Sequence, residues 1–317
     1  MVNANPSILY LEVVAACDMS CPMCVTLPYR EGSRSQLSRE QIRTLLLEPA
    51  ARRGMTSLVL GGGEPTLRPD VLDIVRDAVT CGFAVRFATN LLHIKPAMLQ
   101  GLIEVLDGEE HSVAVSYDSL QTSAFQIIRG GDFLAGVEAN CADLLRLRRE
   151  LRSHVKTRAT IVVQEENLNS VLATIDHVLN RLGFDEVGVY LRHDYKHVTM
   201  DTIADQKMPE WCRRNRVALI QLGLQLYKRA SEDSRIQVSG SIDDWIYLVS
   251  DPHRIARRCH AGNFLFFNTE GRLRSCMFGT EYADIKQTPL DGIVALDGFA
   301  EARKLHASCS ICVLACN

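Results

Sequence analysis

The chain has 317 residues, 47% of them hydrophobic, and a mean hydropathy near zero, which is typical of a soluble globular protein and argues against disorder. Its 35 Lys and Arg face 38 Asp and Glu, and no long basic run creates the field that nucleic acid or an anionic membrane requires. Because nowhere do about 18 apolar residues occur together, and no basic N-terminal segment precedes an apolar run, we expect a cytoplasmic protein without membrane or nucleic-acid partners.

Six short apolar runs alternate with amphipathic helical patterns over the first two thirds of the chain. The runs have the length of buried strands and cover residues 7–14, 57–60, 84–89, 112–117, 157–163 and 186–191. The helical patterns begin after Ser38, near Pro69 and near Pro96, and cover 133–151 and 168–182 before Gly183, which is suited to end a helix. This alternation predicts an α/β fold with a parallel sheet, and six such units fit a partial (β/α)6 TIM-like barrel.

The pattern changes beyond residue 200. A helical pattern covers about 209–230, an irregular stretch with Gly240 and Trp245 follows, and two short apolar arms then flank a turn at 269–271, which predicts a β-hairpin. We therefore divide the chain into a barrel at 1–195, a helical connection at 196–255 and a small C-terminal hairpin and helix domain at 256–317.

Eight of the eleven cysteines fall into two groups, which indicates metal ligands rather than disulfides in a cytosolic chain. Cys17, Cys21 and Cys24 follow the first strand. The second group lies near the end of the chain and comprises Cys259, Cys276, Cys309, Cys312 and Cys316. The isolated Cys81, Cys141 and Cys212 have the pattern of small buried apolar residues. Structural zinc and a [4Fe–4S] cluster both take four protein ligands, so three cysteines in one loop would leave one iron of a cluster open to another ligand.

Polar groups gather where the predicted strands end, which is where βα barrels carry their function. The second strand runs into GGGEP at 61–65, the third ends at Thr89 and Asn90, the fourth at 116–119 and the sixth at 190–197. Glycines let a backbone approach a ligand closely, Glu64 offers a carboxylate, and Pro65 stiffens the turn. These groups are expected to converge on one face of the barrel.

The spacing Cys17-x-x-x-Cys21-x-x-Cys24 after the first strand, with GGEP at 62–65 after the second, resembles the radical S-adenosylmethionine (radical SAM) superfamily over most of residues 8–195. The resemblance implies a [4Fe–4S] cluster on the three cysteines, with S-adenosylmethionine on its open iron. It also implies one-electron cleavage of S-adenosylmethionine to methionine and a 5′-deoxyadenosyl radical, which takes a hydrogen atom from the substrate. A flavodoxin- or ferredoxin-type protein would be the reductant.

Several barrel residues are expected to contact S-adenosylmethionine. The GGEP segment offers carboxylate and carbonyl acceptors to the methionine ammonium group through Gly62, Gly63, Glu64 and Pro65. Asn90, Ser116 and Asp118 are candidates for the ribose or the carboxylate. Arg129, which we expect to begin a helical region, is suited to pair with the methionine carboxylate.

The second cysteine group resembles the auxiliary-cluster region of the SPASM/twitch subfamily. Cys259 and Cys276 flank the predicted hairpin, and two of Cys309, Cys312 and Cys316 would complete one auxiliary [4Fe–4S] cluster, with the Cys309 and Cys312 pair favoured by its spacing. Five cysteines are too few for the two auxiliary clusters of a full SPASM region. A structural zinc ion on the same four thiolates fits the spacing equally well.

The expected substrate is a small polar natural-product intermediate, such as an amino sugar or aminocyclitol, that undergoes epimerisation. The barrel mouth would present Tyr190, Arg192, His193 and Asp194 to its hydroxyl or amino groups, and Cys212 or Cys316 would donate a hydrogen atom. Radical alcohol dehydrogenation with the auxiliary cluster as electron acceptor is an alternative. Modification of a ribosomal peptide is another, although only sixteen residues precede Cys17. The non-enzymatic alternative is an iron–sulfur or zinc scaffold protein.

Overall fold

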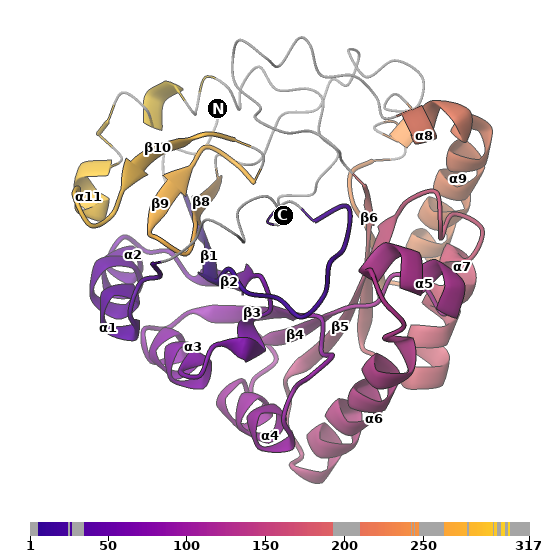
Figure 1. Ribbon diagram of the computed structural model, residues 1–317, viewed down its shortest axis with the longest axis horizontal. Helices are drawn as coiled ribbons and strands as arrows, with labels where there is room; N and C mark the ends of the chain where they lie inside the picture. Colours follow the sequence, from indigo (N-terminus) through magenta and orange to yellow (C-terminus); the bar gives the residue numbers. More distant parts are fainter. Residues whose placement is uncertain are drawn as a thin grey trace.

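A curved sheet with helices on its outer face dominates the structure (Figure 1). The computed structural model describes residues 6–24, 26, 35–192, 210–241, 243, 245–246, 263–277, 279–293, 295–296, 299–301 and 304. Within these residues the strand order is β10-β9-β8-β1-β2-β3-β4-β5-β6-β7. The first six strands lie side by side in chain order and parallel, as the alternating sequence pattern predicts. They are β1 (Ile8–Val14), β2 (Ser57–Gly62), β3 (Ala84–Thr89), β4 (Ser112–Ser116), β5 (Lys156–Val163) and β6 (Glu186–Leu191).

The hydrophobic core lies between the convex face of the sheet and the helices. Successive side chains of a strand point to opposite faces, so Leu9 and Leu11 of β1 are buried toward the helices while Ile8 and Tyr10 face the concave side. The concave face carries many small residues, among them Ala88 and Ala114. The inside of this partial barrel is therefore a cavity rather than a packed core.

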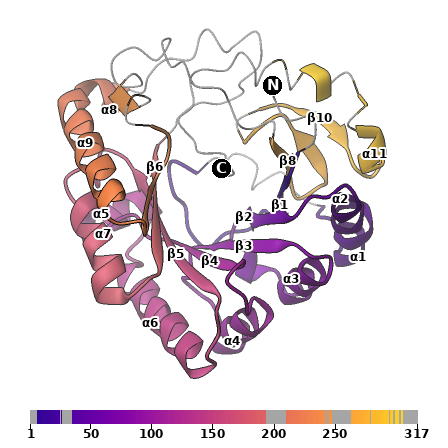
Figure 2. The same ribbon diagram turned by 180° about the vertical axis from the view of Figure 1, so that it is seen from behind.

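Helices cover the convex face, as the view from behind shows (Figure 2). The described helices are α1 (Arg39–Gln41), η2 (Ile42–Leu47), α2 (Glu48–Arg52), η3 (Pro65–Leu67), α3 (Val71–Thr80), α4 (Pro96–Val105), α5 (Thr122–Arg129), α6 (Leu134–Glu150), α7 (Val171–Asp176), η4 (His177–Leu182), α8 (Glu210–Arg214), α9 (Arg216–Glu232) and α11 (Leu290–Ile293). The predicted cap at Ser38 is present as a capping box with Gln41. Gly183 ends η4 with φ +92°, as its sequence position indicates.

One barrel helix was not expected from the sequence. Helix α5 buries Ala124, Phe125 and Ile128 on one face, but it has only eight residues, and Gln121 before it provides no side-chain cap. Arg129 therefore ends a helix, and the expectation that it begins one is wrong. Gly130 follows it in the left-handed conformation, with φ +79°.

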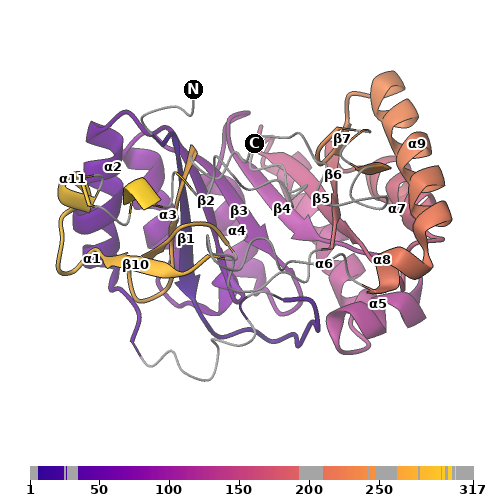
Figure 3. The same ribbon diagram turned by 90° about the horizontal axis from the view of Figure 1, so that it is seen from above.

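The C-terminal hairpin joins the barrel sheet instead of forming a separate layer. Strands β8 (Phe264–Phe267) and β9 (Arg272–Arg274) form the predicted hairpin, and β10 (Glu281–Asp284) extends it. Strand β8 pairs in parallel with β1, so the hairpin continues one edge of the sheet, and β7 (Ile236–Val238) continues the other (Figure 3). The fold class expected from the sequence is confirmed. The proposed boundaries at 195/196 and 255/256 lie outside the described residues.

Candidate active site

The GGEP segment is hydrogen-bonded to the end of β1 and to the cysteine loop, which we define as residues 15–24. The amide N–H of Gly63 donates to the Val14 carbonyl at 2.7 Å, and that of Glu64 donates to the Ala16 carbonyl at 2.8 Å. A Cβ atom at Gly63 would lie 2.1 Å from the Ala16 oxygen, so only glycine allows this approach. The two motifs that are 40 residues apart in the sequence thus form one backbone cradle.

The end of α5 closes the same cradle from the other side. A Cβ atom at Gly130 would lie 2.4 Å from Ser20 Oγ, which again requires glycine. Arg129, just before it, extends its Nη1 to within 3.7 Å of Cys21 Sγ. Both contacts bring α5 against the cysteine loop.

All three cysteines of the loop line one cavity of about 170 Å³, here called the cysteine-loop cavity. Its other described lining residues include Gly61, Gly62, Gly63, Glu64, Asn90, Ser116 and Arg129. Cys17 Sγ accepts from Asn90 Nδ2 at 3.7 Å, and Cys24 Sγ lies 3.1 Å from Thr26 Oγ1. Burial raises the pKa of the Cys21 thiol, and the nearby Arg129 guanidinium acts against that rise.

The donor set of this cavity fits a [4Fe–4S] cluster with bound S-adenosylmethionine. Three thiols supply three of the four ligands that such a cluster takes, and the fourth position is free for another ligand. The described residues contain no group of three or more His, Cys, Asp or Glu side chains already placed to hold a metal ion, so the thiols would turn toward the cluster as it binds. When bound, the cluster supplies the electron that cleaves S-adenosylmethionine.

The Glu64 carboxylate is fixed in place by hydrogen bonds within the protein. It is 1% exposed, and its Oε1 accepts from Thr66 N at 3.1 Å, Thr66 Oγ1 at 2.7 Å and Thr89 Oγ1 at 2.7 Å. Its Oε2 accepts from Asn90 N at 2.7 Å. Burial raises the pKa of this carboxyl, and these hydrogen bonds oppose the rise. Glu64 still lines the cysteine-loop cavity, and Oε2 accepts this one hydrogen bond, so the prediction that the segment receives the methionine ammonium through Glu64 and its backbone carbonyls stays a prediction.

Asp118 holds Arg129 instead of facing the cavity. Its side chain is fully buried and is absent from the described lining of the cavity. Asp118 Oδ2 lies 2.5 Å from Arg129 Nη2, and Oδ1 accepts from Val162 N at 2.7 Å. Asp118 is thus a partner of Arg129 rather than the ribose or carboxylate ligand expected from the sequence. Arg129 Nε is buried without a hydrogen-bond partner in the described chain, so a donor remains for a ligand carboxylate.

Asn90 and Ser116 lie where the sequence places them, at the ends of β3 and β4 in the cysteine-loop cavity. Asn90 Nδ2 also donates to Asp18 Oδ1 at 2.6 Å, and Asn90 Oδ1 accepts from Leu92 N at 2.8 Å. Its side chain therefore fastens the cysteine loop to β3. Thr66 and Thr89, which hold Glu64, were not singled out as site residues because their role depends on a contact between distant segments.

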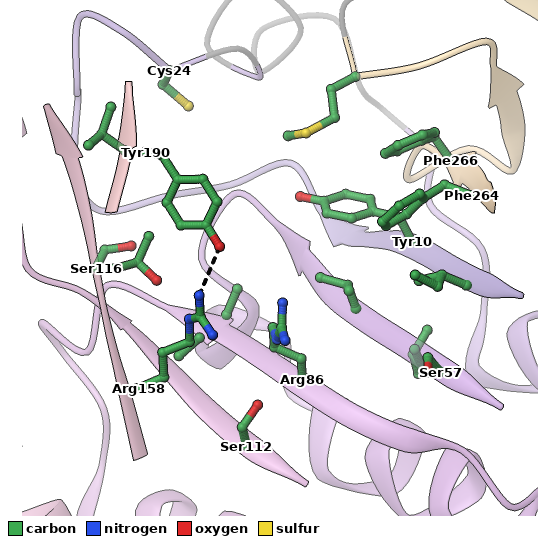
Figure 4. A pocket seen from close by; sticks show the side chains of 18 of the residues that line it. Tyr10, Cys24, Ser57, Arg86, Ser112, Ser116, Arg158, Tyr190, Phe264 and Phe266 are labelled. Atoms are coloured by element: carbon green, nitrogen blue, oxygen red, sulfur yellow. Dashed lines mark hydrogen bonds between the residues drawn. The ribbon is translucent and has the colours of Figure 1, made fainter. Parts of the chain in front are cut away.

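A larger cavity of about 600 Å³, here called the barrel cavity, occupies the concave side of the sheet (Figure 4). Tyr10, Phe264 and Phe266 form an aromatic wall from β1 and β8. Tyr190 and Arg192 also line it, as the sequence predicts, whereas the predicted His193 and Asp194 lie outside the described residues. The two cavities are contiguous because they share the lining residues Tyr10, Cys21, Cys24, Ala88, Ser116 and Arg129.

The remaining predicted cysteines are only partly described. Cys212 lies in α8 with 1% of its surface exposed and is not among the described residues that line either cavity. Cys276 follows β9, and its neighbour Met277 lines the barrel cavity. The other cysteines of the second group, Cys259 and the three of which two were expected as ligands (Cys309, Cys312 and Cys316), lie outside the described residues. Among the described helices, none is both long and apolar enough to cross a membrane.

A β-sheet half-barrel with a three-cysteine loop and a glycine-rich cradle defines a class of radical enzymes, and the sequence comparison agrees. The profile of the Radical SAM superfamily matches residues 11–178, more than half of the chain. This chain therefore belongs to the radical SAM superfamily, and it is a radical SAM enzyme.

Two curated relatives illustrate its similarity. The first is the tungsten-containing aldehyde ferredoxin oxidoreductase cofactor-modifying protein of Pyrococcus furiosus, which is 31% identical over 180 residues, or 56% of this chain and 49% of the relative. The second is a PqqA peptide cyclase of Rhodopseudomonas palustris, 25% identical over 279 residues, or 86% of this chain and 67% of the relative. The chain thus spans about half the length of the first and two thirds of the second.

The fold is shared with Streptococcus suis SuiB, solved in complex with its precursor peptide SuiA. The two chains superpose with a TM-score of 0.69 at 15% identity, covering 98% of this chain and 71% of SuiB. Together with the PqqA peptide cyclase, this likeness agrees with the SPASM/twitch-type subfamily recognised from the sequence.

Proposed function

We propose that this radical SAM enzyme modifies a residue of a ribosomally made peptide after abstracting a hydrogen atom from it. The observation that carries the proposal is the barrel cavity. It has a volume of about 600 Å³ and is contiguous with the cysteine-loop cavity. Among the curated relatives, the PqqA peptide cyclase aligns with 86% of this chain. SuiB, which has the same fold, binds a precursor peptide.

The peptide replaces the amino sugar or aminocyclitol expected from the sequence. A sugar carries a hydroxyl on most of its carbons, and each buried hydroxyl needs a hydrogen-bond partner. The aromatic wall of Tyr10, Phe264 and Phe266 offers an apolar surface instead. Apolar side chains of a peptide can pack against such a wall, and the peptide named for the two similar proteins favours this substrate class.

The chain's own residues would hold the reactants in place. Gly62 and Gly63 would present their backbone to the methionine part of S-adenosylmethionine, and Arg129, fixed by Asp118, would bind its carboxylate. Ser116 lines both cavities, so it lies between the cofactor and the substrate. The aromatic wall would keep water from the substrate radical.

The second cysteine group would hold one auxiliary [4Fe–4S] cluster in this proposal. Cys276 stands at the end of β9 next to a residue of the barrel cavity, so a cluster held there would lie near the substrate. Cys259 and two of Cys309, Cys312 and Cys316 would be the other ligands. A substrate radical that loses an electron needs an acceptor, which favours an oxidative modification over epimerisation. The burial of Cys212 away from both cavities also argues against its acting as hydrogen-atom donor.

The substrate class can be tested with anaerobically reconstituted enzyme, S-adenosylmethionine and a flavodoxin- or ferredoxin-type reductant. We would compare a panel of short peptides with a panel of amino sugars, using release of 5′-deoxyadenosine above the substrate-free rate as the readout. Transfer of deuterium from labelled peptides into 5′-deoxyadenosine is the expected result. Stimulation by amino sugars alone would contradict the peptide assignment. A Cys17, Cys21 and Cys24→Ala triple variant is the control for cleavage that does not depend on the cluster.

A further inference from the structure

Two arginines project into the barrel cavity from strands that flank β4. Arg86 lies on β3 and Arg158 on β5, and both side chains point toward the space between Tyr190 and Tyr10 (Figure 4). Arg86 is opposite Ser112 in the strand register, and Arg158 is opposite Ala114. Small side chains therefore lie between them on β4, and the cavity extends across both arginines.

Arg158 is held in a fixed position by the protein. Its Nη1 donates to Glu186 Oε1 at 2.8 Å and to Gln237 Oε1 at 2.7 Å, while Nη2 donates to Tyr190 Oη at 3.1 Å. A Cβ atom at Gly188 would lie 2.2 Å from Arg158 Nη2, so this glycine makes room for the guanidinium. The charge of Arg158 is neutralised by Glu186.

Arg86 has no such partner. It is half-buried, and it forms no hydrogen bond or ion pair within the described part of the chain. Glu110 is the one carboxylate among the described residues that line this cavity, and its side chain is 62% exposed, 3.5 Å from His111 Nε2. A guanidinium without a counter-charge in a largely apolar cavity is costly unless an anion joins it.

We propose that Arg86 binds a carboxylate of the substrate. The planar guanidinium of arginine matches a carboxylate with two parallel hydrogen bonds. The aromatic wall opposite would contact an apolar group of the same ligand. This inference rests on the proposed function in one respect: the peptide substrate would supply the carboxylate, either from an acidic side chain or from its C-terminus.

The position of this subsite separates it from the reacting carbon. Ser116, beside the cysteines, is four residues beyond Ser112 on β4, which corresponds to about 13 Å of strand. The carboxylate would therefore anchor the substrate at a distance from the abstracted hydrogen. Loss of Arg86 should raise KM much more than it lowers kcat.

The subsite can be tested by binding alone, on reconstituted enzyme with S-adenosylmethionine and without reductant. The probes are N-acetylglutamate α-amide, its neutral isostere N-acetylglutamine amide, N-acetylalanine as a terminal carboxylate, and inorganic phosphate. Calorimetric titration should show that one of the carboxylate probes binds at least tenfold more tightly than the glutamine probe. The tighter of the two carboxylates identifies the source. Equal binding of charged and neutral probes, or tighter binding of phosphate, would overturn the proposal.

Four variants distinguish loss of the carboxylate subsite from a general folding defect. Arg86→Gln should abolish the carboxylate preference, and Arg86→Lys should keep part of it because it retains the charge. Ser112→Asp, directly opposite Arg86, would supply an internal carboxylate and should also abolish the preference. The exposed Arg181→Gln is the matched control and should bind as the wild type does. A preference retained by Arg86→Gln, or lost equally in Arg181→Gln, would contradict the assignment. Because no turnover is measured, failure of the peptide proposal would not affect this result.

Discussion

At the scale of single residues, the site depends on buried polar groups that are held mainly by partners from other segments of the chain. Glu64 accepts hydrogen bonds from Thr66, Thr89 and Asn90, and Asp118 is paired with Arg129. Glu64 and Asp118 could be picked out from the sequence as charged residues at the ends of predicted strands, and Arg129 from the resemblance to the radical SAM superfamily. Their partners could not be predicted, because Asp118 and Arg129 are 11 residues apart and Glu64 and Asn90 are 26 apart, and no local pattern records such contacts.

Glu64→Gln should destabilise the protein by about 2 kcal/mol. The new side-chain NH2 group would face the Asn90 N–H, so neither of these two donors would have an acceptor. Asn90 contacts Cys17, so retention of iron should fall as well. Denaturant unfolding and iron content are the measurements, and the exposed Glu232→Gln is the control. Unchanged stability would show that Glu64 is not the anchor of the cradle.

At the scale of elements, Arg68 joins three segments around the base of the cysteine loop. Its Nη1 donates to the Val13 carbonyl at 2.7 Å, and Nη2 donates to the Leu37 carbonyl at 2.9 Å. Its Nε lies 2.7 Å from Asp70 Oδ1 just before α3. Strands and long helices were predictable from apolar periodicity, and the caps at Ser38 and Gly183 from single residues. The eight-residue α5 was missed because it is short and lacks a capping side chain.

The Arg68 guanidinium lowers the pKa of Asp70 below its usual range, mainly through their hydrogen bond. A carboxyl whose pKa is lower in the folded state stabilises the fold above its unfolded pKa of about 4, and this contribution is lost as pH falls further. The stability difference between wild type and Asp70→Asn should therefore be largest near neutral pH and shrink below about pH 4. Unfolding curves at several pH values measure it. A difference independent of pH would contradict the role of this ion pair.

At the scale of the whole molecule, one sheet carries both the half-barrel and the C-terminal hairpin. The free edge of β1 is covered by β8, which removes an exposed strand edge and brings Phe264 and Phe266 to the barrel cavity. Arg274 of β9 is buried, lies 3.4 Å from the partly buried Glu12 of β1 and strengthens this junction. The hairpin itself was predictable from its turn, but its pairing with β1 was not, because 250 residues separate the two strands.

Burial raises the pKa of Glu12, and the positive charge of Arg274 opposes that rise. Arg274→Gln would remove this favourable interaction between β9 and β1, so it should loosen the hairpin. We expect the amides of β8 and β9 to exchange roughly tenfold faster with solvent deuterium, while β3 to β5 stay protected. Arg272→Gln alters the exposed neighbour on the same strand and should have little effect. Equal exchange in both variants would argue against the Arg274–Glu12 pair as the junction.

The most direct test of the central claim is release of 5′-deoxyadenosine from S-adenosylmethionine by the reduced, anaerobically reconstituted protein. The wild type should form 5′-deoxyadenosine and methionine in equal amounts, because the three thiols of one cavity would hold the cluster that cleaves the sulfonium. The Cys17, Cys21 and Cys24→Ala triple variant should form neither. Release of 5′-deoxyadenosine by the triple variant at the wild-type rate, or by neither protein, would contradict the account.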